Sequence, residues 1–301
     1  MSSASSGIDQ PGLNRPAPVQ PPVQGLAWSR RLPRSMTMSG LIGAFLVVFW
    51  LLIALFGPLL APHGVGSIVS YEVFEPVSAQ YLLGTDYLGR DMFSRVLHGA
   101  RFTVGLALAA ALLASVTGTA LGVFAAVSGR WIDEAISRLL DALICIPSKI
   151  FALVMVAAFG SSLPLLLITA GLSYLPGAFR IARSLAVNLN TMDYVQVARA
   201  RGEGRLYLTW VEILPNMIHP MLADFGLRFV FVVLLLSGLS FLGLGVQPPD
   251  ADLGSLVREN ISGLAEGAPA VVAPALAIAT LTIGVNLLID SLPGKARRPG
   301  E

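Results

Sequence analysis

The sequence predicts an all-α protein, a bundle of about six transmembrane helices, on three observations. Of its 301 residues, 54% are hydrophobic and only 13% are charged, about half the charged share of a typical soluble domain. Apolar stretches of the length that crosses a bilayer as a helix recur along the chain. Arginines gather in alternate connecting segments. These patterns are typical of a multi-pass membrane protein.

Six segments are apolar enough to cross the membrane, some of them marginally: 39–60, 103–127, 143–160, 163–180, 218–244 and 269–290. The first is longer than the apolar core of a cleaved signal peptide, so we expect it to be retained. The third and fourth adjoin, so a tight turn near Ser161 and Ser162 must join them. In the second, Gly118 and Gly122 have the spacing that lets helices approach closely, although this is also ordinary composition for a membrane helix.

The termini differ in composition from the spans. The first 28 residues are rich in Ser, Pro, Gln and Gly and cannot bury enough apolar surface to order themselves. We therefore divide the chain into a disordered tail (1–35), the first span with an external segment (36–101), a transmembrane core (102–292) and a short second tail (293–301).

The basic residues orient the bundle, because cytoplasmic segments of membrane proteins retain positive charge. Thirteen fall in the two tails, in 128–142 and in 181–217, and Arg180 adjoins the last of these, whereas 61–101 and 245–268 carry only Arg90, Arg95, Arg101 and Arg258. The bias predicts that both termini lie in the cytoplasm.

A short polar helix is expected between the fourth and fifth spans. Asn190 or Thr191 can cap its N-terminus, and Asp193 places a negative charge in its first turn. Arg199 and Arg201 suit its last turn, and Gly202 suits the left-handed position that ends a helix.

A second helical run, Leu206 to Leu214, should stop at Pro215, which cannot continue the hydrogen-bond ladder. Residues 190–215 then form either an amphipathic connector on the lipid surface or a docking knob for a cytoplasmic partner.

Two ionisable residues stand in the fifth span. Asp224 and Arg228 are four apart and share one helix face. They either neutralise each other, with help from Lys149 in the third span, or line a pathway and contact charged cargo.

Several kinds of chemistry find no support in the sequence. A P-loop needs a lysine followed by Ser or Thr, but Lys149 and Lys295 are followed by Ile150 and Ala296. A single cysteine, Cys145, provides neither a disulfide nor a multi-cysteine metal site. We expect no bound cofactor, no metal site, no nucleic-acid partner and no enzymatic activity, so transport energy must come from a separate subunit or an ion gradient.

Several stretches in order resemble one known family. "YVQVARARGEGRLYLTWVEILPN" (194–216) is similar to the "EAA" loop of ABC-importer permeases, with Ala198, Gly202, Ile213 and Pro215 matching and Gln196 standing where glutamate is usual. "LGTDYLGRD" (83–91), "RLLDALICIP" (138–147), "LPGAFRIAR" (175–183), "LSFLGLGVQPP" (239–249) and "NLLID" (286–290) resemble the dipeptide, oligopeptide and nickel branch of these permeases.

The resemblance implies a permease with the type I ABC-importer fold in a bacterial inner membrane. Its partners would be two ATPases that use ATP, a second permease, which we expect to be a different chain, and an external substrate-binding protein. The ATPase-coupling residues would be Gln196, Ala198, Arg199, Gly202, Ile213, Leu214 and Pro215. Asp86, Arg90 and Asp91 are candidates for external contact, and Lys149, Asp224 and Arg228 for the pathway. The alternative is a secondary transporter or channel without an ATPase.

The arginine bias makes a topology prediction. Cysteines placed at Ser70 and Ala251 should react from outside with an impermeant thiol reagent, whereas one at Ser5 should not. Labelling of the tail at position 5 in intact cells would overturn the orientation.

Overall fold

The computed structural model describes residues 37–292, so the predicted tails at 1–35 and 293–301 lie outside the described residues. Every regular element within this range is helical, which confirms the predicted fold class. The helices are α1 (Met38–Leu60), α2 (Met92–Ser128), α3 (Arg130–Ile144), α4 (Ser148–Phe159), α5 (Leu163–Asn190), α6 (Asp193–Ala200), α7 (Arg205–Tyr207), the π-helix η1 (Leu208–Ile213), α8 (Leu214–Phe241), α9 (Leu253–Glu259), the 3₁₀ helix η2 (Ile261–Leu264) and α10 (Pro269–Ser291).

Five helices in this range are long and apolar enough to cross a membrane, and the count rises to six if the bent pair α3–α4 is one span. The four predicted spans outside 143–160 and 218–244 lie within α1, α2, α5 and α10. The helices extend beyond the predictions where polar residues continue the periodic pattern. α5, for example, runs on to Asn190.

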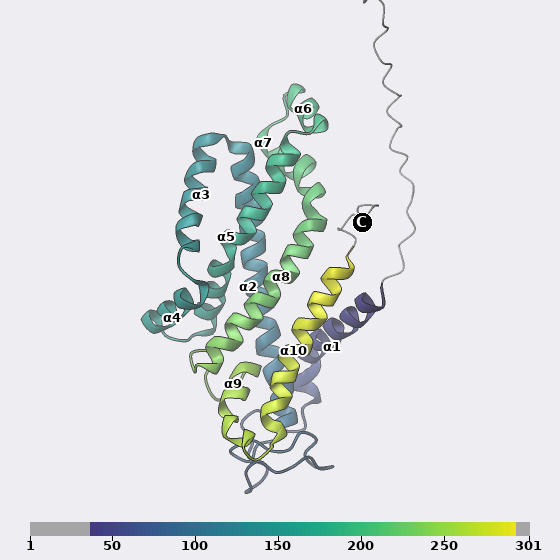
Figure 1. Cartoon of the computed structure of the whole chain (residues 1–301), viewed down its shortest axis with the longest axis vertical. Coiled ribbons are helices and arrows are strands. Elements are labelled where there is room, and N and C mark those ends of the chain that lie inside the picture. The colour runs from purple at the N-terminus through teal and green to yellow at the C-terminus, as the bar shows by residue number, and fades with distance from the viewer. Residues whose placement is uncertain (1–36, 293–301) are drawn as a thin grey trace, which may run out of the picture. The chain divides into compact units, whose positions relative to one another are not determined.

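The closest helix contact joins α2 to α5, which lie side by side (Figure 1). A Cβ atom built on Gly118 would lie 2.5 Å from the Ala178 Cβ, and one on Gly122 would lie 2.8 Å from the Phe179 carbonyl oxygen. Only glycine leaves room for this approach, so the small residues predicted in the second span are packing residues.

The apolar helices α1 and α10 pack against each other. A Cβ atom on Gly43 would lie 2.5 Å from the backbone nitrogen of Leu288, and the Trp50 indole donates a 3.0 Å hydrogen bond to the Thr280 hydroxyl. The remaining surface of α1 exposes large apolar side chains such as Phe45 and Leu55. Such a surface is suited to lipid.

The prediction of one continuous span at 143–160 is wrong. The helix breaks at Cys145–Pro147, and α3 and α4 meet at an angle of 81°. Pro147 lacks a backbone N–H and disfavours the helical conformation for Ile146 before it. Residues 130–142, part of the segment predicted to connect two spans on the cytoplasmic side, form most of α3, and Asp133 of this helix pairs with Arg183 of α5.

The prediction that the second helical run stops at Pro215 is also wrong. α7, η1 and α8 form one helical stretch of 37 residues from Arg205 to Phe241. Pro215 lies in the first turn of α8, directly after the π-helical turn Leu208–Ile213. A π-turn shifts the hydrogen-bond register, so the N–H that proline lacks is not required there.

The segment between α1 and α2 forms tight turns at Gly84 and Gly89, with φ of +71° and +68°. Ala251, however, is fully buried, at 0% exposure. It is therefore unsuitable for surface labelling, and Ser78, which is exposed, replaces it as the second external position in the topology test.

The α2–α5 contact predicts that one methyl group added at Gly122 will destabilise the protein. Gly122→Ala should lower the melting temperature of the purified protein, because overpacking costs about 1–3 kcal/mol. Gly105→Ala is the matched control, since it lies in the same helix and a Cβ there meets nothing within 4 Å. Equal melting temperatures for the two variants would show that the glycine contact does not constrain the helices.

Candidate functional site

The N-terminus of the short helix α6 is not built as predicted. Its N-cap is Met192, which provides no side-chain hydrogen bond, and the Thr191 hydroxyl donates to the Asn188 carbonyl at 2.8 Å instead. The predicted caps at Asn190 and Thr191 are therefore wrong. Asp193 does occupy the first turn, where its charge favours the helix dipole.

The C-terminus of α6 has the predicted glycine cap. Gly202 has a φ of +87°, and its N–H donates to the Arg199 carbonyl at 3.0 Å. The N–H of Glu203 reaches back to the Ala198 carbonyl at 3.2 Å. This pair of bonds is a Schellman motif, which satisfies the last helix carbonyls and turns the chain sharply. Arg199 is in the last turn and Arg201 is the C-cap residue.

The inner face of α6 packs on the protein itself. Val195 and Ala198 are fully buried in one apolar cluster that draws residues from α2, α5, η1 and α8. The other members are Val123, Ala182, Ala186, Leu208, Ile213, Met217 and Met221. Of the remaining predicted coupling residues, Leu214 is half-buried and Pro215 is exposed.

The outer face of α6 is exposed and mixed in character. Val197 is exposed beside Arg199, and Leu206 and Trp210 are exposed on the helical turns that follow. Burial, with a smaller contribution from the charge of Glu212, raises the pKa of the Tyr194 hydroxyl, so this side chain is neutral at physiological pH. α6 lies beyond the end of α3, at one end of the described helices (Figure 1).

Hydrogen bonds fix the outer face of α6 to the end of α5. The Gln196 amide donates to the Asn190 carbonyl at 2.8 Å, and the Arg199 guanidinium donates to the Asn190 side-chain oxygen at 2.8 Å. Gln196 stands at the position where the resemblance places glutamate, and its side chain holds α6 against the end of α5 within this chain.

Asp224 and Arg228, predicted to share a face of the fifth span, form a bidentate ion pair. The Arg228 Nε and Nη2 atoms donate to the two Asp224 carboxylate oxygens at 2.6 and 2.8 Å. Asp224 is 7% and Arg228 is 6% exposed. The third nitrogen, Nη1, donates to the Tyr174 carbonyl of α5 at 2.8 Å. Gly177 makes room, because a Cβ there would lie 2.7 Å from Arg228 Nη1.

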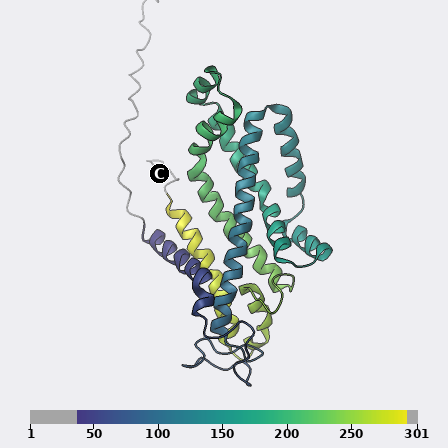
Figure 2. The ribbon, with the colours of Figure 1, turned by 180° about the vertical axis from the view of Figure 1, so that it is seen from behind.

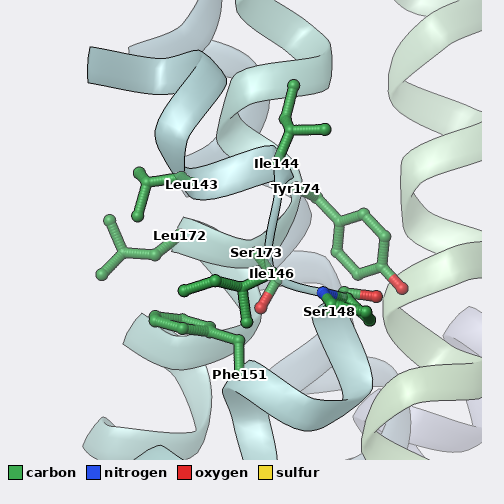
Figure 3. A pocket seen from close by; sticks show the side chains of 9 residues that line it. Leu143, Ile144, Ile146, Ser148, Phe151, Leu172, Ser173 and Tyr174 are labelled. Atoms are coloured by element: carbon green, nitrogen blue, oxygen red, sulfur yellow. The ribbon is translucent and has the colours of Figure 1, made fainter. Parts of the chain in front are cut away.

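Lys149 does not join this pair. It is exposed on α4 and takes part in none of the ion pairs found within residues 37–292. A nearby pocket of about 200 Å³ lies where α3 bends into α4, lined by Ile146, Phe151 and Tyr174 among others (Figure 3).

The predicted external residues take part in a buried network. Asp86 accepts hydrogen bonds from Arg90 and Arg95, each at 2.6 Å, and Glu259 of α9 accepts from the same two arginines at 3.1 and 2.9 Å. Sequence reasoning missed Arg95 and Glu259 as members, because Glu259 lies 164 residues from Arg95 in the chain.

Asp91 is the N-cap of α2. Its carboxylate accepts hydrogen bonds from the N–H groups of Phe93 and Ser94 at 3.3 and 3.1 Å, so this aspartate caps the helix. With the side chains of Asp86, Arg90 and Asp91 all turned inward, contact between these residues and an external protein stays a prediction.

Within residues 37–292, no three His, Cys, Asp or Glu side chains come close enough together to hold a metal ion.

Comparison with known proteins defines the class. Residues 118–298 match the family described as binding-protein-dependent transport system inner membrane component. Over 288 residues the chain is 32% identical to the di/tripeptide transport system permease protein DppC of Pseudomonas aeruginosa, covering 94% of this chain and 92% of the relative. Over 252 residues it is 31% identical to the dipeptide transport system permease protein DppC of Alkalihalophilus pseudofirmus, covering 84% and 83%. Over 266 residues it is 30% identical to the glutathione transport system permease protein GsiD of Pectobacterium atrosepticum, covering 88% and 87%.

The chain therefore belongs to the family of binding-protein-dependent transport system inner membrane components. It is a multi-pass permease subunit of an ABC importer and works with ATPase and substrate-binding partners. This confirms the predicted class over the alternative of a secondary transporter or channel.

The buried ion pair predicts how charge reversal acts. Asp224→Arg alone should prevent stable folding, because it leaves two buried cations side by side, and removing one partner of a buried pair already costs about 3–5 kcal/mol. The double variant Asp224→Arg, Arg228→Asp should recover much of the lost expression, measured by size-exclusion chromatography. Recovery of uptake with unchanged substrate preference would remove any pathway role. Recovered folding with lost transport and normal ATPase assembly would favour one.

Proposed function

We propose that this chain is one of two permease subunits of an importer that carries peptides or similar small solutes into the cytoplasm. Two separate ATPase subunits hydrolyse the ATP, and both termini of this chain lie on their side of the membrane. An external substrate-binding protein delivers the cargo.

The observation that carries the proposal is the construction of α6. Val195 and Ala198 bury its apolar face against the ends of α2, α5 and α8, so that face is not available to lipid. The opposite face remains exposed with Val197 and Arg199 on it. A helix held at both ends and packed on three spans can transmit a push from a bound ATPase to the bundle. This favours the hypothesis that residues 190–215 form a docking site for a cytoplasmic partner over the hypothesis that they lie on the lipid surface.

Contact with the ATPase would depend on shape and apolar area more than on one ion pair. Gln196 carries no charge and is occupied by Asn190. The exposed side chains of Leu206 and Trp210 supply apolar surface next to the arginines. Trp and Arg are both enriched in protein–protein interfaces, where buried apolar anchors are surrounded by a polar rim.

The cargo class is proposed from the relatives, whose names specify dipeptides, di- and tripeptides and glutathione. All of these carry free carboxylates. The Asp224–Arg228 pair is proposed as a structural link between α8 and α5, because both charges are already satisfied within this chain.

The glycine cap tests the coupling proposal. Gly202→Val should leave membrane insertion intact but lower uptake and ATPase copurification several-fold. A β-branched residue in the left-handed region costs about 1–2 kcal/mol and would displace α6. Uptake of labelled dipeptide in cells and copurification of the ATPases measure the two effects.

Gly204→Val is the matched control for this variant. Gly204 has a φ of −75°, which any residue can adopt, and a Cβ at either glycine meets nothing within 4 Å. Uptake that falls equally in both variants, or in neither, would contradict a role for the shape of this turn in coupling.

A further inference from the structure

A second pocket, of about 310 Å³, opens between the C-terminal end of α8 and the short helix α9. Tyr87, from the turn that precedes α2, forms part of its wall, and the Tyr87 N–H donates a 3.1 Å hydrogen bond to the Asn260 side chain after α9. α9 lies at the end of the described helices opposite α6 in both views (Figure 1 and Figure 2). With α6 in the cytoplasm, this pocket opens to the outside, and its volume suits a small solute.

One cation in the wall of this pocket has no partner within the described part of the chain. The Arg258 side chain is exposed and takes part in none of the hydrogen bonds or ion pairs found in residues 37–292. Its guanidinium is nevertheless packed on the backbone, because a Cβ atom built on Gly243 would lie 2.7 Å from Arg258 Cζ. Gly243 has a φ of +84°, so glycine both ends α8 and leaves the room that the guanidinium occupies.

The carboxylate next to Arg258 in sequence is already neutralised. Glu259, which also lines the pocket, accepts hydrogen bonds from Arg90 and Arg95 at 3.1 and 2.9 Å. The same two arginines contact Asp86, so two carboxylates balance two guanidinium groups. The charge of Arg258 is additional to this balanced network, and it makes the pocket favourable for an anion.

A third carboxylate lies behind the pocket and is also occupied. The Ser240 hydroxyl donates to one oxygen of Asp252 at 2.5 Å, and the Ser255 N–H donates to the other at 2.7 Å. Ser240 and Ser255 line the pocket and separate it from this buried aspartate. The carboxylates around the pocket are therefore engaged with other groups and leave Arg258 to an external one.

Two other groups in the wall can contact the rest of a ligand. The Gln247 amide nitrogen donates to the Gly243 and Gly245 carbonyls at 3.2 and 2.9 Å, which fixes this side chain. Its amide oxygen accepts no hydrogen bond from residues 37–292 and can accept one from a peptide N–H. The ring of Tyr87 provides apolar surface beside these polar groups.

We propose that this pocket binds the free carboxylate end of a small peptide on the external side of the membrane, with the Arg258 guanidinium as the recognition group. A guanidinium can donate two parallel hydrogen bonds to one carboxylate, which an amide group cannot accept in the same way. The Gln247 oxygen accepts the neighbouring peptide N–H, and Tyr87 contacts the adjoining side chain. The site holds cargo between its release outside and its entry into the bundle. This inference rests on the proposed function, because it requires peptide cargo delivered at this end.

Equilibrium dialysis of the whole importer in lipid nanodiscs, without the external binding protein, tests the site. The probes are radiolabelled alanyl-alanine and the same dipeptide with a C-terminal amide. The wild-type complex should bind the free acid several-fold more tightly than the amide, and Arg258→Gln should remove this preference. Arg101→Gln is the matched control, since it removes the same charge from an exposed position outside the pocket, and it should keep the preference.

Equal binding of acid and amide by the wild type, or an equal loss of preference in both variants, overturns the assignment. A wild-type complex that transports alanyl-alanine but binds none of it in dialysis overturns the assignment as well.

A second measurement separates the cargo from the external binding protein as the source of the carboxylate. The affinity of the binding protein for the same nanodiscs should be equal for Arg258→Gln and the wild type. Weaker docking to Arg258→Gln with unchanged dipeptide binding would assign Arg258 to the binding protein and overturn the cargo site.

Uptake of labelled dipeptides by cells with the wild-type importer tests the proposed function separately. If no dipeptide is taken up, the proposed cargo class fails and the site fails with it. Normal uptake together with equal binding of acid and amide overturns only this pocket.

Discussion

The close contact between α2 and α5 is the constraint on which the other contacts of the described bundle depend. Gly118 and Gly122 bring the two backbones together, and α5 then positions other elements from its own surface. The Asn190 residue at its C-terminal end accepts hydrogen bonds from Gln196 and Arg199 of α6. In the middle of α5, the Tyr174 carbonyl accepts a hydrogen bond from Arg228 of α8. Further along, Arg180 and Arg183 form ion pairs with Asp141 and Asp133 of α3. A shift of α5 would therefore move α6, the buried ion pair and the bent helix pair α3–α4 together.

Charge inside the bundle serves mainly to join elements that are distant in sequence. Arg228 pairs with Asp224 on its own helix and reaches across to α5. Arg95 connects the turn at Asp86 with Glu259 of α9, at the end of the described bundle opposite α6. In a low-dielectric environment an unpaired charge is costly, so each group requires a partner with good geometry. The result is a set of fixed contacts near both ends and in the middle of the bundle.

Two prolines show how similar local chemistry leads to different outcomes. Pro147 ends α3 and separates it from α4 by 81°, whereas Pro215 lies inside a continuous helical stretch. The difference is the π-turn Leu208–Ile213, which precedes Pro215 and removes the need for its missing N–H. Buried Leu208 and Ile213 hold that turn against the bundle. No comparable packing covers Ile146, which is exposed within this chain.

The sequence by itself determined the all-α class, the approximate spans, the left-handed Gly202 and the Asp224–Arg228 pair. These depend on composition, on residue spacing within one helix or on the backbone freedom of one glycine, all of which are local. Only the tertiary structure decided that Asn190 braces α6 instead of capping it and that residues 130–144 form a helix. It also decided that Lys149 lies away from Asp224 and that Glu259 completes the network at Asp86. The Asp86 network and the contact of α3 with α5 depend on partners 164 and 50 residues apart in the chain, and one-dimensional spacing carries no information about which distant groups will meet. Asn190 contacts residues only six and nine positions away, but which of its groups cap and which accept from α6 is set by how α6 packs on the bundle.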